Sequence, residues 1–137
     1  MSDQPGIEHV SKDGEVYAII ARASLARSGF NFVSRPEDSL QLGVNHYPAG
    51  GQVKPHVHLP LERQLINTLE VLHIDSGAAA LVLYDDEKRP FYETQLVAGD
   101  TVILIRGGHG LQIQQETRII EVKQGPYLGP AKDKVLF

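Results

Sequence analysis

Residues 68–87, TLEVLHIDSGAAALVLYDDE, contain two short apolar runs with an Asp-Ser-Gly turn between them. The turn residues are those that tolerate positive φ or cap a bend. Similar runs recur along the chain, separated by Gly, Pro, Asn and Asp: EVYAIIA (15–21), SLQLGVNHYPAGG (39–51), QVKPHVH (52–58), FYETQLVAGD (91–100), TVILIRGG (101–108), HGLQIQ (109–114) and TRIIEVKQG (117–125). Strands this short and regularly spaced predict an all-β antiparallel sandwich or barrel with little helix.

The composition indicates one domain and excludes several classes of function. The 137 residues, 42% of them hydrophobic, are enough for a single packed domain over residues 1–137. The net charge is −4 with no run of basic residues, so we expect no nucleic-acid and no membrane partner. The chain has no cysteine, which excludes disulfides, a thiolate nucleophile and sulfur ligands. The first residues are polar, and no apolar stretch is long enough to span a bilayer, so we expect a cytoplasmic protein.

Two of the six histidines stand one residue apart in QVKPHVH. Residues two positions apart in a strand point to the same face, so Lys54, His56 and His58 share one face. Two imidazole nitrogens on one face can bind the same ion. Because cysteine is absent, the other ligands have to be histidine, carboxylate or water, which favours Zn, Fe, Ni, Mn or Co. The pattern therefore predicts one divalent metal ion.

Two carboxylates are candidates for the third ligand. Glu62 follows His58 by four residues, whereas Glu70 begins the run EVLHIDSG. In that run Glu70 shares a face with Leu72 and Ile74, which we expect to be interior. An unpaired carboxylate there is costly to bury, and a divalent cation would offset that cost. Glu70 is the preferred candidate, and Glu62 is the alternative.

The fourth candidate ligand is His109 in RGGHGLQI. It alternates with Leu111 and Ile113 on what we expect to be an inner face. His73 should face away from Glu70 and is interpreted as structural.

Three segments, GGQVKPHVH, EVLHIDSG and AGDTVILIRGGHG, resemble the two sequence motifs of the cupin superfamily. In the first motif, five residues separate Gly50 from His56, and six residues separate Glu70 from Gly77. The second motif is represented by a Gly-Asp pair, an apolar strand and His109.

The resemblance implies a single cupin-type jelly-roll β-barrel with a core over about residues 40–124, and a homodimer. It also implies a metal ion bound inside the barrel by His56, His58, Glu70 and His109. The family's metal sites accept small molecules, and several polar residues are candidates to contact one. We expect Glu62 or His46 to act as the base if a protein base exists, and the candidate ligand-binding residues are Lys54, Arg106 and Tyr47.

The predicted function is a metal-binding cupin that binds or acts on a small polar molecule of the carbohydrate or carboxylate type. The metal would serve as a Lewis acid or as an oxygen-binding centre. Catalysis is left open, with a metal-dependent isomerase, epimerase or dioxygenase as the enzyme classes. The alternative is a non-catalytic ligand-binding or sensor module with a structural metal.

Overall fold

The computed structural model describes residues 4–25, 29 and 31–137. In chain order the elements are β1 (Ile7–Lys12), β2 (Glu15–Ala21), β3 (Glu70–Ser76), β4 (Ala78–Tyr84), β5 (Pro90–Val97), β6 (Thr101–Leu104), β7 (Gly108–Ile113), β8 (Arg118–Lys123) and α1 (Pro130–Asp133). Within the described residues α1 is the only helix, so the predicted all-β class with little helix is confirmed. No helix in this part of the chain has the length and apolar character needed to cross a membrane.

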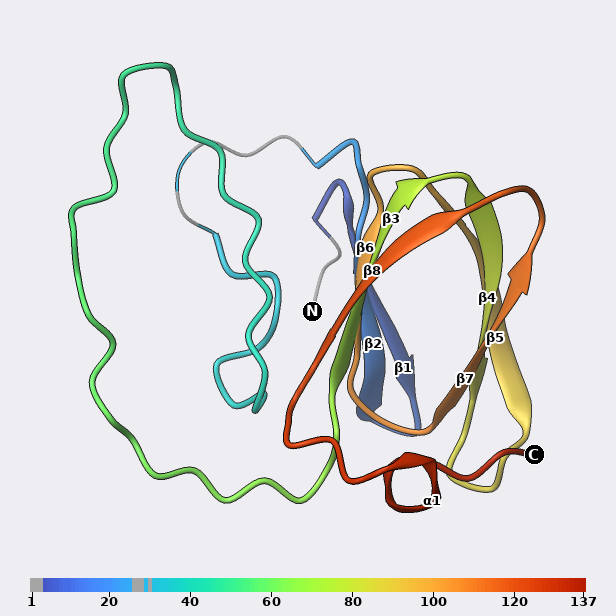
Figure 1. The fold of residues 1–137 in the computed structure, drawn as a ribbon. Coiled ribbons are helices and arrows are strands. Elements are labelled where there is room, and N and C mark those ends of the chain that lie inside the picture. The colour runs from blue at the N-terminus through green and yellow to red at the C-terminus, as the bar shows by residue number, and fades with distance from the viewer. Residues whose placement is uncertain (1–3, 26–28, 30) are drawn as a thin grey trace.

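The strands form two antiparallel sheets that face each other (Figure 1). The larger sheet has the order β1-β2-β6-β3-β8, and the smaller has the order β5-β4-β7. Over the described residues the two sheets are not closed into a barrel. Their facing sides bury the main core, with Ala18, Ile20, Leu72, Ile74, Val102 and Leu104 from the larger sheet and Leu81, Leu83 and Leu96 from the smaller.

A second apolar cluster covers the outer face of the larger sheet. Ile19 of β2 and Ile103 of β6 point outward, because they alternate with core residues, and both are fully buried. They pack against the segment of residues 33–44, which contributes Val33, Leu40, Leu42 and Val44. β2 is therefore buried on both faces, which explains its nearly continuous apolar sequence.

A glycine turn carries the chain from the larger sheet to the smaller between β3 and β4. Gly77 has φ 90, which favours glycine. A Cβ at this position would lie 2.4 Å from the carbonyl oxygen of Glu116. The turn therefore requires glycine, and the two strands that it joins belong to different sheets and do not pair with each other.

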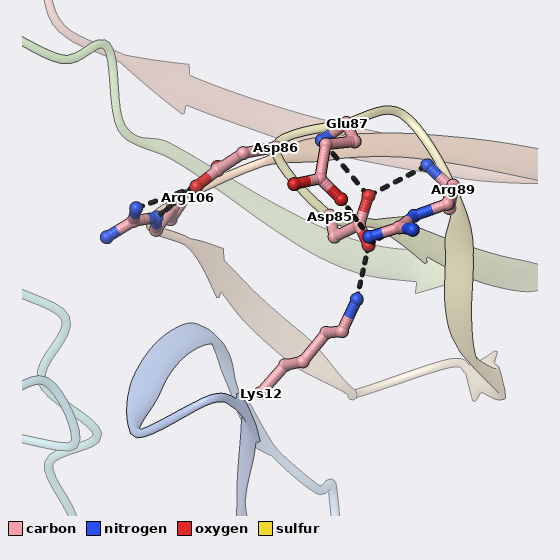
Figure 2. A network of polar contacts seen from close by, with 6 residues as sticks. All are labelled: Lys12, Asp85, Asp86, Glu87, Arg89 and Arg106. Atoms are coloured by element: carbon pink, nitrogen blue, oxygen red, sulfur yellow. Dashed lines mark hydrogen bonds and ion pairs between the residues drawn. The ribbon is translucent and has the colours of Figure 1, made fainter.

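The turn between β4 and β5 is held by the buried carboxylate of Asp85 (Figure 2). This carboxylate accepts hydrogen bonds from the backbone N–H groups of Glu87, at 3.1 Å, and Arg89, at 2.9 Å. The side chain of Arg89 donates to it at 3.2 Å, and the ammonium of Lys12 also contacts it. Because Lys12 ends β1, this ion pair joins the larger sheet to a turn of the smaller sheet.

Residues 46–68, which we call the arm, extend away from the two sheets (Figure 1). Every residue of the arm is exposed. The strands predicted over 39–51 and 52–58 are not formed, and the chain there makes only two isolated bridges, Gly29 with His46 and Phe32 with Gly43. The physical reason is that a β-strand needs a neighbouring strand for its hydrogen bonds, and beyond the His46 bridge the arm has no such neighbour among the described residues.

Candidate functional site

Glu70 and His109 come from opposite sheets and meet between them. Glu70 is the first residue of β3 and points inward with Leu72. His109 lies on β7 opposite Leu83 of β4, and paired residues share a face, so it also points inward. His109 Nε2 lies 3.1 Å from Glu70 Oε2. The two inward orientations are those that the alternation in the sequence predicts.

Both side chains line a cavity of about 740 Å³. Its wall is strongly charged, with five carboxylates and three lysines: Glu70, Asp85, Asp86, Glu121, Asp133, Lys88, Lys123 and Lys134. Its apolar lining comes mainly from Leu72, Leu111, Val135, Leu136 and the rings of Tyr84 and Phe137. A cavity with this lining suits a small polar molecule.

The environment of Glu70 keeps its carboxyl group ionised. The hydrogen bond from His109 holds the pKa of Glu70 below its ordinary value, although burial of the carboxyl works in the opposite direction. At neutral pH Glu70 is therefore an anion whose partner is an imidazole. A carboxylate in this state can accept hydrogen bonds or bind a cation.

Two cavity residues that the sequence reasoning missed lie on β8. Leu72 pairs with Glu121 and Glu70 pairs with Lys123, so both β8 side chains point toward the cavity. Lys123 Nζ lies 3.2 Å from Glu121 and 3.3 Å from Asp133, and these two acids raise the pKa of the lysine, Glu121 the more strongly. The alternation in RIIEVK (118–123) could have predicted this placement, because its second residue, an isoleucine that can enter the core, shares one face with the fourth and sixth residues.

The C-terminal tail forms one side of the cavity. The ring of Phe137 meets the ring of Tyr84 edge to face, with centroids 5.1 Å apart. Lys88 Nζ lies 5.5 Å from the centroid of Phe137. Phe137 also lies against Gly108, where a Cβ would come 2.8 Å from the ring. Glycine at this position lets the tail approach the strand that carries His109.

His56 and His58 lie together on the arm, away from Glu70 and His109. Their ring centroids are 5.2 Å apart, and His56 Nδ1 lies 2.9 Å from the carbonyl oxygen of Lys54. In the described part of the chain no three His, Asp or Glu side chains are close enough together to hold a metal ion. The four predicted metal ligands therefore form two pairs, one between the sheets and one on the arm.

The other predicted site residues of the arm do not line the cavity. His46, Tyr47, Lys54 and Glu62 are all exposed. His46 exchanges backbone hydrogen bonds with Gly29, at 2.6 and 2.9 Å. The role of a base for His46 or Glu62, and that of a ligand contact for Lys54 and Tyr47, therefore stay predictions.

Arg106 and His73 do not line the cavity, although Asp86, which holds Arg106, belongs to its wall. Arg106 donates to Asp86 Oδ2 through two nitrogens, at 2.6 and 2.9 Å (Figure 2). It also lies 3.4 Å from Glu15. His73 Nδ1 lies 2.8 Å from the hydroxyl oxygen of Thr101, its pairing partner on β6. The position of His73 agrees with its predicted structural role, because it faces the side opposite to Glu70.

No protein-family model matches the chain, and comparisons with curated proteins and with solved structures found no similar protein.

Proposed function

We propose that this protein binds one divalent metal ion at Glu70 and His109 and uses it to hold a small polar molecule in the cavity. The observation that carries the proposal is the 3.1 Å contact between these two side chains, which are distant in sequence and come from facing sheets. The two remaining ligands are His56 and His58 of the arm, whose rings lie within 5.2 Å of each other. In this arrangement the arm adds a strand to the sandwich and completes a jelly roll of the cupin type.

The donor set fits a borderline divalent cation. Three neutral imidazoles and one carboxylate are ligands that Zn, Fe, Ni, Mn and Co accept. Glu70 is ionised at neutral pH, as a ligating carboxylate has to be. When bound, such an ion polarises a carbonyl or carboxylate group, or lowers the pKa of a bound water.

The cavity wall supports a polar ligand of the carbohydrate or carboxylate type. Lys123 supplies a cation that can pair with a carboxylate, and Glu121 supplies an acceptor for hydroxyl groups. Tyr84 and Phe137 add aromatic surface next to these charges. The enzyme classes expected from the sequence, a metal-dependent isomerase, epimerase or dioxygenase, remain part of this proposal.

The test is metal binding by single-residue variants. Chelator-treated wild-type protein is titrated with Zn²⁺ by calorimetry, and we expect about one ion per chain. Glu70→Gln and His109→Ala should each weaken binding by more than about 100-fold, since even contacts that only orient a ligand are worth about 10–100-fold.

Glu62→Gln is the matched control, because it makes the same chemical change at an exposed carboxylate of the arm. We expect it to bind Zn²⁺ as the wild type does. If Glu62→Gln weakened binding more than Glu70→Gln, the ligand role would pass to Glu62. Wild-type protein that binds no divalent ion would reject the proposed function.

A further inference from the structure

The arm carries a concentration of exposed apolar side chains. All of residues 46–68 are exposed, with Val57 at 85% and Ile66 at 92% of their full accessible surface. The large apolar side chains exposed on the arm are Val53, Val57, Leu59, Leu61, Leu65 and Ile66. Exposed apolar residues gathered in one segment mark an interaction surface. We therefore expect another surface to cover the arm.

The arm and β7 both have unpaired backbone edges. Beyond His46, the one backbone–backbone hydrogen bond described within the arm joins the N–H of Gly51 to the carbonyl of Pro48 at 3.0 Å. β7 pairs with β4 alone among the described strands, so its other edge is open. An open strand edge accepts an extended segment by adding it to the sheet. Residues 52–58 are an extended candidate, with valines at 53 and 57 alternating with histidines.

Charge also matches the arm to the cavity beside β7. The arm contains Lys54 and Arg63 but only one carboxylate, Glu62. The cavity wall contains five carboxylates and three lysines. Asp85 and Asp86 are already paired with Lys12, Arg89 and Arg106, and Glu121 and Asp133 are paired with Lys123. Glu70, whose partner is His109, is therefore the carboxylate of this wall that a positively charged arm can meet.

The position of the arm favours the β7 edge of a second copy of the chain, rather than that of its own chain, as the edge that the arm covers. The segment of residues 33–44, from which the arm starts, packs on the outer face of the larger sheet. Figure 1 shows the arm extending on that side, so that the larger sheet lies between it and β7 of the same chain. In this position the arm lies apart from β7 of its own chain and is exposed, so that a second copy of the chain can reach it.

We infer that two copies of the chain exchange arms, so that the arm of each lies along β7 of the other. The exchange places the partner's His56 and the partner's His58 beside Glu70 and His109. This inference rests on the proposed function, because the shared ligand is the divalent ion. In a two-fold arrangement each arm gains a neighbouring strand, and the open edge of each β7 gains a hydrogen-bonding partner. Each metal site is incomplete in one chain and complete in the pair.

The decisive experiment mixes two defective chains. The arm variant carries His56→Ala and His58→Ala, and the body variant carries Glu70→Gln and His109→Ala. The two are co-expressed with different affinity tags, and the mixed pair is isolated through both tags. Each variant alone should bind no Zn²⁺. The mixed pair should bind about half as much Zn²⁺ per chain as the wild type, since one of its two sites unites an intact arm with an intact body.

A matched control pairs the arm variant with a chain that carries all four substitutions, and this pair should bind no Zn²⁺. Wild-type protein that binds Zn²⁺ together with a mixed pair that binds none would place the site within one chain and overturn the exchange. Wild-type protein that binds no Zn²⁺ would instead reject the proposed function itself.

A second measurement does not depend on the folding of the variants. Light scattering of wild-type protein with Zn²⁺ should give twice the chain mass of 15.1 kDa. A Zn²⁺-loaded protein with the mass of one chain would overturn the exchange, whatever the variants show.

Discussion

At the scale of single residues, Asp85 shows how one carboxylate can hold two sheets together. It is buried, and it receives hydrogen bonds from its own turn as well as the ammonium of Lys12 from β1. The hydrogen bond from Lys12, followed by that from the backbone of Arg89, lowers the pKa of Asp85 from 3.8 to about 2. The folded state therefore binds this proton more weakly than the unfolded chain does.

The stability of the protein should depend on pH through Asp85. A lowered pKa contributes stability that is fully present above pH 3.8 and is lost as the pH falls toward about 2. We expect Asp85→Asn to lower the free energy of unfolding at pH 7 and to make its decrease between pH 4 and pH 2 shallower. Urea unfolding at several pH values measures both effects.

Asp86→Asn is the control for this prediction, because Asp86 lies in the same turn but its side chain is half exposed. Exposed ion pairs contribute little to stability. Equal losses in the two variants at pH 7 would show that the turn does not depend on the buried carboxylate.

At the scale of elements, β2 depends on packing against both of its faces. One of its faces belongs to the core between the sheets, and the other is covered by residues 33–44. Ile20 lies on the first face and Ile19 on the second, and both are fully buried. The segment before the arm is thus part of the folded body and anchors the start of the arm.

Truncation of either isoleucine should be equally damaging. We expect Ile19→Ala and Ile20→Ala each to lower the free energy of unfolding by about 2–5 kcal/mol, which is the usual cost of such a cavity. Ile120→Ala on β8 should cost much less, since Ile120 is 43% exposed. Chemical denaturation of the three variants measures these losses. A small loss for Ile19→Ala would mean that residues 33–44 do not cover this face in solution.

Alternation predicts the strands of the two sheets well, although their partners can lie far away in the chain, as β6 and β8 do from β3. The runs from residue 70 to residue 123 form strands, and the alternation correctly places Leu72 and Ile74 in the core. The runs at 39–51 and 52–58 have strand-like sequences but form no strand. Local alternation cannot specify which strand, or which copy of the chain, supplies the hydrogen-bonding partner.

The candidate site was predictable only where it depends on local alternation. The inward orientation of Glu70 and His109 follows from alternation with apolar neighbours in their own strands. The nearness of Lys123 and the tail residue Phe137 depends on the register of β3 with β8 and on the path of the chain after β8, which local patterns do not encode.

At the scale of the whole molecule, the proposed metal binding should change how easily a protease cuts the arm. Arg63 is the trypsin site of the arm, because Lys54 is followed by proline. In the presence of a chelator we expect rapid cleavage after Arg63, since the segment is exposed and lacks backbone partners. Saturating Zn²⁺ should slow this cleavage at least tenfold, because metal binding fixes the arm on a body. Mass spectrometry of the digest over time measures the rate.

The variant with His56→Ala and His58→Ala serves as the control for this digestion, and its arm should be cut at the same rate with and without Zn²⁺. Cleavage after Arg118, which is exposed but lies within β8, reports whether the two sheets stay folded during the digestion. Protection after Arg63 in this control variant would show that Zn²⁺ acts on the arm without these histidines.

The contact between Phe137 and Gly108 links the far end of the chain to the residue next to His109. On this side of the cavity the rings of Phe137 and Tyr84 lie beside the ammonium of Lys88, so a guest molecule there meets aromatic surface and positive charge together. A guest with a flat ring would therefore compete with Phe137 for its place against Tyr84, whereas a guest without a ring would leave that contact intact.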